Sequence, residues 1–453
     1  GGAMVMRGWD SYAYNCTFIN NTAAMHGGAA YLTNTTYNPL NNNTGFVLCI
    51  FTNNTAGYNG GAVDWYAGAT HGYIEDCTFT NNTAKRSGGA VHWSGHYGSI
   101  SNSTFTGNNA TGEVTSTIAG ITGGGDGGAV VWVGSHGIIN DSCVFTNNYA
   151  ANRGGAVFLH GNSTENCTNV TVHSSTFEYN VAGTNGGALD WHSGAHDGSI
   201  TNSTFRYNVA NANGGAVYWR GHHGDIISSN FTNNTAKGLV AGPYGNQGDG
   251  GAVLWAGING TVVDCWFVNN TAARNGGAVY LENCSHGNWN TTFSHSHFIN
   301  NTAGYNGGAI YYHEGAHDGK ISYSEFINNT AKRNGGAIFW NGYNGTVKNS
   351  RFENNRATGT NWEHTMDLNM GDTIVVNNDG SLTLGNIIVI QSSQLPTDTP
   401  TSEDQNKLFV LNYTNGNMHA FKSYVADNST GTLKWLKLDE TEVSADTISP
   451  VDW

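Results

Sequence analysis

The sequence predicts an all-β fold, a parallel β-helix, in which the chain winds through a stack of similar coils. The tripeptide GGA occurs twelve times, and a second motif, F-x-x-N-x-A, also occurs twelve times in strict alternation with it. Apolar residues around both motifs alternate as in half-buried strands, and helical spacing is absent. Internal repeats of roughly 20 to 50 residues are typical of solenoids.

The spacing of the motifs gives the size and number of the coils. Successive GGA motifs lie 26, 33, 28, 39, then 27, 32, 28, 36, then 26, 31 and 28 residues apart. The pattern repeats after four units, so we expect about 12 to 13 coils in three tandem four-coil blocks. A charged fraction of 11%, with 63 Gly against 5 Pro, excludes both an ordinary cytosolic enzyme and a charged disordered tail.

Each unit contains short strands joined by corners. After GGA come an aliphatic, a variable and a large apolar residue, as in 63–65, which predicts a strand with one buried face. A second strand-like pattern, I-x-x-[CS]-x-F, precedes the motif Phe, as in 74–79. Paired Gly suits a corner that excludes a Cβ. The Trp residues after GGA suggest either a sugar-stacking stripe or core packing, and their place in the strand favours the core.

Stacking of equivalent residues explains why the phrase is repeated. Equivalent residues of successive coils lie about 4.8 Å apart in a parallel β-helix. The motif Phe then forms an inward column, and the motif Asn forms a ladder in which stacked amides satisfy one another. This ladder is expected to comprise Asn21, Asn54, Asn82, Asn108, Asn148, Asn180, Asn208, Asn234, Asn270, Asn301, Asn329 and Asn355.

The repeat ends near residue 357, and composition divides the rest of the chain. We assign residues 1–394 to the β-helix with a terminal cap, 395–407 to a linker, and 408–453 to a small β module or the start of a further segment. The chain opens on GGAM, within a motif, so we expect a piece of a longer protein. The sequence contains no run of about 18 apolar residues, so it predicts no transmembrane helix.

Charge and cysteine usage limit the partners. The formal net charge of -14 argues against nucleic acid, because phosphate binding needs a basic face. No motif points to a cofactor, and we expect none. Five of the seven Cys stand two residues before the motif Phe, where Ser also occurs. We interpret them as small buried residues and leave a disulfide between neighbouring coils open.

The paired tetrapeptides resemble a known repeat. GGAV at 60–63 and FTNN at 51–54 are similar to the repeats of chlamydial polymorphic outer-membrane proteins. The Asn/Thr-rich form, FxNNTA followed by GGA, looks still more like the large adhesin-like surface proteins of methanogenic archaea. The resemblance covers residues 1 to about 357. It implies a right-handed β-helix passenger displayed outside the cell, with adhesion the usual assignment, and it carries over no catalytic residue.

Glycosylation acceptors recur in the repeat. The sequence contains 24 N-x-[ST] sequons, of which seven come from the NNT of the motif itself. In these seven the acceptor precedes the ladder Asn, which places it at an outward corner where a glycan has room. Turn chemistry in an Asn-rich chain is the alternative explanation. The seven acceptors are Asn20, Asn53, Asn81, Asn233, Asn269, Asn300 and Asn328.

Binding is expected where the repeat is interrupted. Expansions before GGA occur at 111–126 and 237–249, and a third, 358–372, precedes TIVV, which we align with the strand after GGA. A second set of loops follows the GGA strand at 34–45, 160–169 and 282–289. Two combs of loops on a stiff rod would form a multivalent surface; neutral insertion is the alternative. The candidate contact residues are Ile118, Ile121, Leu239, Val240, Pro243, Tyr244, Trp362 and Met366.

The histidine and acidic residues of the repeat suggest two further kinds of site. Stacked turns would bring His96 near His71, or His196 near His222, as weak candidates for a bridging metal, but polar turn caps are the favoured explanation. Glycoside hydrolysis needs two carboxyls about 5 to 10 Å apart. The best repeat acids, Asp64 and Asp190, are four coils apart. We therefore predict that the chain is not an enzyme.

The sequence-based hypothesis is an extracellular, cell-surface, adhesin-like stalk or passenger. It would bind a cell, a glycan or a surface protein through its projecting loops. The alternative is a structural subunit of a surface layer, sheath or extracellular fibre whose loops contact neighbouring copies. A polysaccharide lyase or hydrolase was the third possibility considered.

Overall fold

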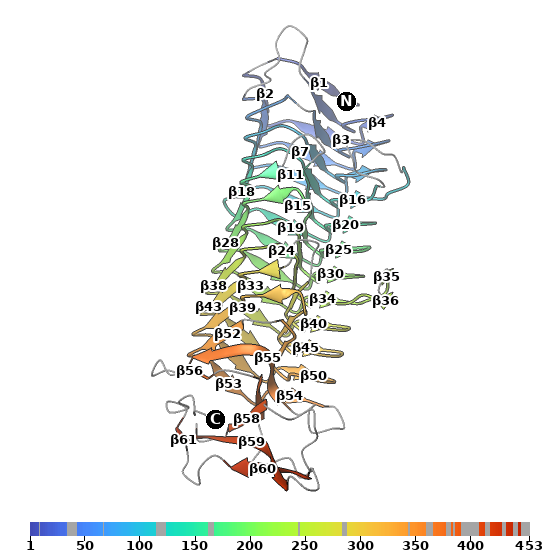
Figure 1. Ribbon diagram of the computed structural model, residues 1–453. Coiled ribbons are helices and arrows are strands. Elements are labelled where there is room, and N and C mark those ends of the chain that lie inside the picture. The colour runs from blue at the N-terminus through green and yellow to red at the C-terminus, as the bar shows by residue number, and fades with distance from the viewer. Residues whose placement is uncertain are drawn as a thin grey trace.

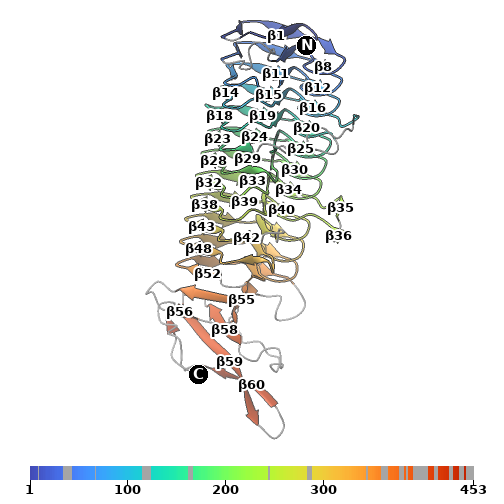
Figure 2. The ribbon, with the colours of Figure 1, turned by 45° about the horizontal axis from the view of Figure 1, so that its top comes forward.

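The chain forms a rod of stacked coils (Figures 1 and 2). Beyond residue 358 only the backbone of the strands is described. Up to that point the computed structural model describes every residue except Trp9, 34–42, Ala67, 115–123, 162–166, Pro243, Tyr244, 283–287 and 343–344. The described part of the chain consists of strands, turns and loops, without a helix, so no described helix is long and apolar enough to cross a membrane.

Each coil contributes one short strand to each of four parallel sheets. Sheet 1 holds the strands that follow GGA: β1 (Met4–Met6), β5 (Ala30–Leu32), β9 (Val63–Trp65), β13 (Val91–Trp93), β17 (Val130–Trp132), β21 (Val157–Leu159), β26 (Leu189–Trp191), β31 (Val217–Trp219), β37 (Val253–Trp255), β41 (Val279–Leu281), β46 (Ile310–Tyr312) and β51 (Ile338–Trp340). Sheet 2 holds β2 (Tyr12–Tyr14), β6 (Gly45–Val47), β10 (Tyr73–Glu75), β14 (Ser99–Ser101), β18 (Ile138–Asn140), β23 (Thr171–His173), β28 (Ser199–Thr201), β32 (Asp225–Ile227), β38 (Thr261–Val263), β43 (Thr292–Ser294), β48 (Lys320–Ser322) and β52 (Gly345–Lys348).

The other two sheets are made by the F-x-x-N-x-A motif. Sheet 3 holds β3 (Thr17–Ile19), β7 (Ile50–Thr52), β11 (Thr78–Thr80), β15 (Thr104–Thr106), β19 (Val144–Thr146), β24 (Thr176–Glu178), β29 (Thr204–Arg206), β33 (Asn230–Thr232), β39 (Trp266–Val268), β44 (His297–Ile299), β49 (Glu325–Ile327) and β53 (Arg351–Glu353). Sheet 4 holds β4 (Thr22–Ala23), β8 (Thr55–Ala56), β12 (Thr83–Ala84), β16 (Asn109–Ala110), β20 (Tyr149–Ala150), β25 (Val181–Ala182), β30 (Val209–Ala210), β34 (Thr235–Ala236), β40 (Thr271–Ala272), β45 (Thr302–Ala303), β50 (Thr330–Ala331) and β54 (Arg356–Ala357).

The register of the sheets is that of the repeat. Phe51 pairs with Phe79 and Phe79 with Phe105, and the same in-register parallel pairing continues through the 12 strands of sheet 3. The predicted all-β parallel β-helix is therefore confirmed. The coil number is slightly lower than expected, at about 11 turns rather than 12 to 13, because twelve stacked strands enclose only eleven steps.

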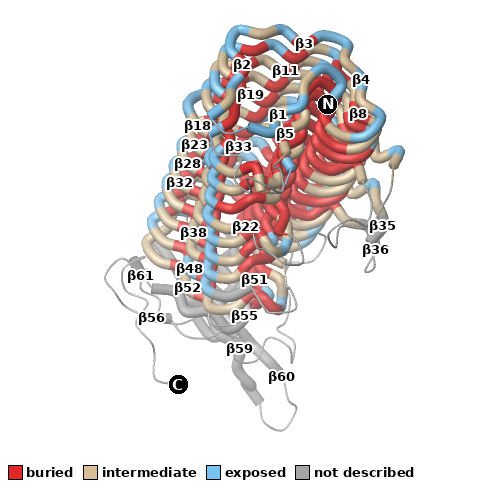
Figure 3. The backbone as a smooth tube through the Cα atoms, turned by 90° about the horizontal axis from the view of Figure 1, so that it is seen from above, coloured by how far each residue is buried: buried red, intermediate tan, exposed pale blue. Residues whose placement is uncertain are grey.

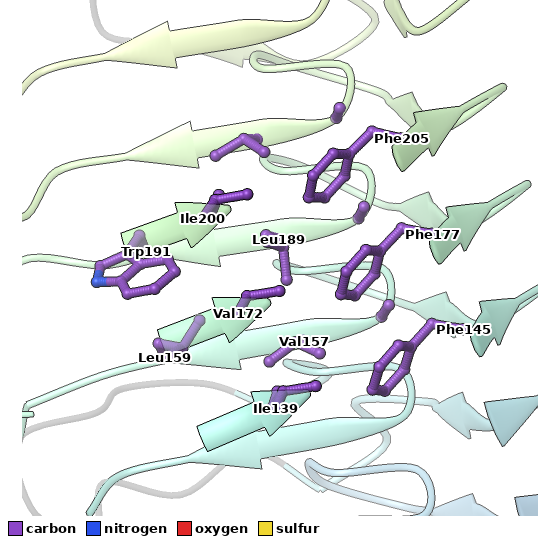
Figure 4. Close-up of a cluster of buried hydrophobic side chains, with 14 of the residues drawn as sticks. Ile139, Phe145, Val157, Leu159, Val172, Phe177, Leu189, Trp191, Ile200 and Phe205 are labelled. Carbon is purple, nitrogen blue, oxygen red and sulfur yellow. The ribbon is translucent and has the colours of Figure 1, made fainter. Parts of the chain in front are cut away.

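Aromatic columns fill the core. The motif Phe side chains stack along the whole rod, with ring centroids 4.6 to 4.9 Å apart. Figure 4 shows Phe145, Phe177 and Phe205 in this column, facing aliphatic residues of sheets 1 and 2. Trp65, with no exposed surface, stacks on the next Trp of sheet 1 at 4.1 Å. The Trp column is thus interior packing and offers no sugar-stacking stripe. Buried residues run as continuous stripes along the rod (Figure 3).

The motif asparagines form a continuous buried column. Asn54 donates from Nδ2 to Oδ1 of Asn82 at 2.9 Å and to the carbonyl of Phe18 at 3.0 Å. Its backbone N–H donates to the same Oδ1 of Asn82 at 3.0 Å. The amide-to-amide distance is 2.8 to 3.0 Å at every step from Asn21 to Asn355. Each buried amide is therefore satisfied by its two neighbours and the backbone.

The Cys and Ser residues before the motif Phe are largely buried, as predicted, and they also form a second polar column. The backbone N–H of Cys49 donates to Sγ of Cys77 at 3.3 Å, and that of Cys77 donates to Oγ of Ser103 at 3.0 Å. Four of the thiols also donate to the carbonyl two residues earlier, as Cys77 does to Glu75 at 3.1 Å, and Cys143 donates to the carbonyl three residues earlier. Cys and Ser interchange at this position because the side chain of either residue can accept a hydrogen bond from the backbone N–H of the preceding coil. Every described cysteine is a free thiol.

The two glycines of GGA have different roles at the corner before sheet 1. Gly60 has a φ of +64°, which glycine adopts without a steric penalty. Gly61 has no such angle, but a Cβ there would overlap the carbonyl oxygen of Gly89 in the next coil. The motif therefore requires glycine twice, once for conformation and once for close packing of neighbouring coils.

The C-terminal strands correct the bounds of the third predicted expansion and the sheet to which TIVV was assigned. β55 (Met366–Val376) pairs in parallel with both β51 and β52, with Leu368 beside Ile338 and Thr373 beside Gly345. The segment TIVV therefore belongs to sheet 2, not to the strand after GGA, and the predicted expansion 358–372 overlaps a strand. Its alternation alone could not distinguish the two sheets. The remaining strands are β56 (Leu382–Thr383), β57 (Asn386–Ile390), β58 (Lys407–Asn412), β59 (Asn417–Asp427), β60 (Thr432–Lys437) and β61 (Val443–Ser444).

These strands extend the pairing past the repeat. β57 pairs with β55 antiparallel and with β58 in parallel, and β59 pairs antiparallel with β58, β60 and β61. The predicted linker 395–407 falls almost wholly outside the described residues. The division at 394 and the separate module at 408–453 stay predictions.

Candidate functional site

The expansions before GGA leave the rod through narrow glycine necks. A Cβ on Gly112 would come within 3.2 Å of Cα of Gly125, and a Cβ on Gly238 within 3.2 Å of Cα of Gly248. The two ends of each expansion therefore lie in contact at the tip between sheet 4 and sheet 1. The strands that follow, β17 and β37, are separated by β21, β26 and β31, so the two necks lie about 19 Å apart on one edge.

The second expansion forms a projecting hairpin. Its strands β35 (Ala241–Gly242) and β36 (Gly245–Asn246) pair antiparallel and stand out from the rod in both views (Figures 1 and 2). Leu239 at its base is 72% exposed. Val240 is half-buried, and its carbonyl accepts the N–H of Gln247 at 3.3 Å.

The other candidate contact residues cannot be placed in the same way. Met366 lies in β55 rather than in a loop, and nothing is described of its side chain. The remaining five lie outside the described residues, namely Ile118, Ile121, Pro243, Tyr244 and Trp362.

The second comb is held by short strands on the turn between sheets 1 and 2. The loop after β21 ends in β22 (Cys167–Thr168), which pairs in parallel with β27 (Ala195–His196) of the next coil. The loop after β41 ends in β42 (Asn288–Trp289), which pairs with β47 (Ala316–His317) in the same way. Both combs are thus anchored to regular coils.

An ion pair with a buried carboxylate closes each described neck. Asp126, which ends the first expansion, accepts two hydrogen bonds from Arg153 of the next coil, at 2.9 and 3.1 Å. Asp249 ends the second expansion and pairs with Arg274, whose Nε donates to Oδ1 at 2.9 Å. An asparagine beside each arginine donates to the same carboxylate. Removing one partner would leave an uncompensated buried charge.

These clamps were missed by the sequence analysis, although a pattern was available. Both expansions end in Gly-Asp before GGA, and the next tip carries Arg and Asn, as ANR at 151–153 and as ARN at 273–275. Because Asn precedes Arg in one tip and follows it in the other, the sequence alone does not show that Arg153 and Arg274 have the same role. Arg153 also lies over the ring of Phe158 at 4.6 Å, which extends the contact to the outward side of sheet 1.

The outward side of sheet 1 buries the two acids that the sequence had singled out. Asp64 and Asp190 are the middle residues of β9 and β26, and their exposed fractions are 2% and 0%. Asp64 lies 2.9 Å from Nδ1 of His26 and 3.3 Å from Nδ1 of His92. Burial alone would raise the pKa of Asp64, but these two histidines lower it overall.

Asp190 has different surroundings. Its neighbours in the adjacent strands are Phe158 and Tyr218, and burial raises the pKa of Asp190 to about 8. His160 and His192 stack beside it with ring centroids 5.1 Å apart. Burial, followed by the charge of Arg153, lowers the pKa of His160 to about 4 and that of His192 to about 3. Both rings are therefore neutral at neutral pH.

The seven predicted glycan acceptors share one conformation at the corner between sheets 3 and 4. All have a positive φ, from 53° to 56°, which asparagine tolerates better than most residues. Six are exposed, and Asn233 is half-buried. The next residue points inward as the ladder Asn, and the following Thr begins the strand of sheet 4. Asn15, Asn102 and Asn202 form sequons in the same way at the corner before sheet 3, with φ from 43° to 50°.

The β-helix corner thus explains the sequon pattern without any sugar. A left-handed Asn, an inward polar residue and an outward Thr are what the corner requires. Glycosylation of these sites stays a prediction. Their exposure on a convex corner leaves room for a glycan.

The predicted histidine pairs are only partly brought together. His196 and His222 stack with centroids 4.9 Å apart, and Nδ1 of His196 accepts the backbone N–H of His222 at 3.0 Å. His71 instead stacks on Tyr97, at 4.9 Å, because the turn places His96 one position out of register with it. Among the described residues no group of three or more His, Cys, Asp or Glu is arranged to hold a metal ion.

The comparisons with known proteins begin with the repeat. Seven segments match the Chlamydia polymorphic membrane protein repeat, at residues 15–33, 48–64, 76–92, 142–159, 267–282, 296–312 and 323–339. The resemblance is thereby confirmed for the repeat itself. A search of curated proteins gave no significant match.

Solved structures with a similar backbone include phage and bacterial β-helices. A double mutant of the tailspike protein of E. coli bacteriophage HK620 is 12% identical, with a TM-score of 0.46 over 94% of this chain and 73% of its own. A mannuronic acid specific polysaccharide family 6 lyase from human gut microbiota is 9% identical, with a TM-score of 0.39 over 82% of this chain and 79% of its own. Tailspike gp49 of Acinetobacter baumannii bacteriophage Fri1, a capsular polysaccharide depolymerase, is 12% identical, with a TM-score of 0.25 over 84% and 63%.

These likenesses show the fold alone, yet they correct one prediction. We had predicted that the chain is not an enzyme. Proteins described as a polysaccharide lyase and a capsular polysaccharide depolymerase are among the similar solved structures. A β-helix therefore gives no ground for excluding catalysis, and we withdraw that prediction.

Proposed function

We propose that this chain is the rod-shaped passenger of an extracellular, adhesin-like surface protein that binds through the loops at its tip corner. One observation carries the proposal: the core columns and the amide ladder run unbroken through the described coils, while the ends of both tip expansions form glycine necks closed by ion pairs with buried carboxylates. Neutral insertion would not require such clamps. The rod keeps the necks of the two loops about 19 Å apart.

Loops fixed on one edge can bind one extended partner at several points. Two weak contacts at a fixed separation gain affinity from effective concentration, provided that the partner spans the separation. A cell-surface glycan or protein with repeated epitopes meets this requirement. The hairpin of the second expansion supplies an apolar contact in Leu239, which is 72% exposed. The repeat resemblance and a predicted glycan-bearing corner support placement outside the cell.

Deletion of the loops tests the proposal with little risk to the fold. Removing residues 113–124 joins Gly112 to Gly125, and removing 239–247 joins Gly238 to Gly248, which already lie in contact. Both clamp aspartates remain. The double-deletion chain should stay folded and soluble while losing attachment to cells and to immobilised glycans.

The control changes the same edge without touching an expansion. Exchange of the short tip 332–334 (KRN) for the sequence of 304–306 (GYN) adds no buried side chain and should leave attachment unchanged. Attachment that survives the double deletion would disprove the proposal. Loss of self-assembly into sheets or fibres, with no effect on attachment, would favour the architectural alternative instead.

A further inference from the structure

Asp64 and Asp190 occupy the same position in two consecutive four-coil blocks, which allows a direct comparison. Each is the middle residue of its strand in sheet 1, and each side chain lies on the outward side of that sheet. Both are buried, to 2% and 0% exposure. The two sites therefore differ in the groups around the carboxyl and not in their place in the fold.

The hydrogen-bond partners differ. The two oxygens of Asp64 bond one histidine each, His26 at 2.9 Å and His92 at 3.3 Å. Neither oxygen of Asp190 has a hydrogen-bond partner among the described residues. The residue beside Asp64 in the next strand is His92, whereas the residue beside Asp190 in the next strand is Tyr218. An ionised carboxylate without such partners is costly to bury.

The charged and titratable groups facing Asp190 do not replace a partner. From the tip, Arg153 is already committed to Asp126 by two hydrogen bonds, so its positive charge is balanced. Arg220, at the end of β31, is exposed, and water screens its charge. On sheet 1, His160 and His192 are neutral at neutral pH for the reasons given above. Burial raises the pKa of Tyr218 far above its usual value, so it too is uncharged.

We propose that Asp190 is a proton-binding site: the folded rod holds it as a neutral carboxylic acid, whereas the equivalent Asp64 is held as a carboxylate. A site with no exposed surface admits no larger ligand. The rod therefore carries a pH-sensitive element in its second block. Between pH 3.8, the usual pKa of Asp, and about 8, the folded state binds one proton more than the unfolded state, so stability falls as the pH rises.

Infrared spectroscopy tests the protonation state in the wild-type chain. The carbonyl band of a buried protonated carboxyl should be present at about pH 6 and disappear on titration through about pH 8. The band should be absent from Asp190→Asn and retained in Asp64→Asn. A carboxylate at Asp190 at about pH 6, as an ion pair with Arg220 would give, would overturn the proposal.

Hydrogen exchange tests the structural consequence. On raising the pH from about 6 to about 9, the wild-type chain should lose protection in β21, β26 and β31, after correction for the intrinsic pH dependence of exchange. Asp190→Asn cannot ionise and should keep that protection, and Asp64→Asn should lose it as the wild type does. Equal pH dependence in the wild type and Asp190→Asn would contradict the proposal.

Discussion

Removal of one rung from the amide ladder should be far more damaging than a change at the neighbouring corner. Asn234 accepts the backbone N–H and Nδ2–H of Asn208 at 3.1 and 3.0 Å. It donates from Nδ2 to the carbonyl of Phe205 and to Oδ1 of Asn270, both at 3.0 Å. Asn234→Ala removes all four bonds. Asn270 keeps one donor, the backbone N–H of residue 234.

The magnitude follows from the groups left behind. Two donors of Asn208 and the carbonyl of Phe205 lose a buried partner, and each such loss costs about 1 to 3 kcal/mol. The free energy of unfolding of the affected coils should fall on the order of 5 kcal/mol. Because solenoid coils open locally, hydrogen exchange followed by mass spectrometry is the assay, with the loss concentrated in β29, β33 and β39.

The neighbouring Asn233 provides the matched control. It precedes Asn234 at the outward corner with a φ of 56°, and Gly107 occupies the equivalent place one four-coil block earlier in the same column. Asn233→Gly removes a sequon but no rung, and exchange should change little, since glycine adopts this φ freely. Asn234→Ala keeps the sequon. Similar protection in the two variants would refute the ladder as a source of stability.

Three further predictions concern single positions. Asp126→Ala leaves the largely buried Arg153 without its counter-charge and should lower stability by about 3 kcal/mol, measured by denaturant unfolding. A change under about 1 kcal/mol would contradict the clamp. Gly61→Ala places a Cβ against the carbonyl of Gly89, and the coils around β9 and β13 should lose exchange protection. Unchanged protection would contradict the close packing at this corner. Asp64→Asn should lower the free energy of unfolding above pH 3.8, because the lowered pKa of Asp64 stabilises the folded state there. The difference from wild type should shrink as the pH falls below 3.8. A pH-independent difference would contradict the ionised state.

The stacked columns could be predicted from the sequence because the repeat fixes them. Once Phe51 and Phe79 are taken as equivalent, the parallel register places every other residue of the motif. Each F-x-x-N-x-A motif places an apolar Phe, an amide Asn and an apolar Ala on the inward side, and few other arrangements would bury all three. The glycine pair was likewise predictable as a corner, although its division into a conformational and a packing role needed the coordinates.

The departures from prediction occur where the repeat gives no register. TIVV alternates like the strand after GGA, but β55 spans sheets 1 and 2, and only its partners show which residues belong to which. His71 and His96 lie in a glycine-rich turn of variable length, where a shift of one residue exchanges the stacking partner for Tyr97. The partner of Asp126 lies one coil later, at a spacing that differs between the two blocks.

The candidate site was predictable only in outline. The sequence located the expansions, because they lengthen the interval before GGA, but not the clamps that hold them. It also marked Asp64 and Asp190 as equivalent without showing that one has histidine partners and the other has none. That difference depends on His26 and His92, which belong to neighbouring coils.

Cross-linking of engineered cysteines tests most directly the central claim that equivalent residues of successive coils lie over one another. Thr80 pairs with Thr106, and Thr106 with Thr146, on the outer side of sheet 3. Thr80→Cys with Thr106→Cys should form a disulfide readily under mild oxidation, because the Cα atoms lie about 4.8 Å apart. Thr80→Cys with Thr146→Cys, about 9.6 Å apart, should not. Equal disulfide yields from the two pairs, measured by peptide mapping, would contradict the stacked rod.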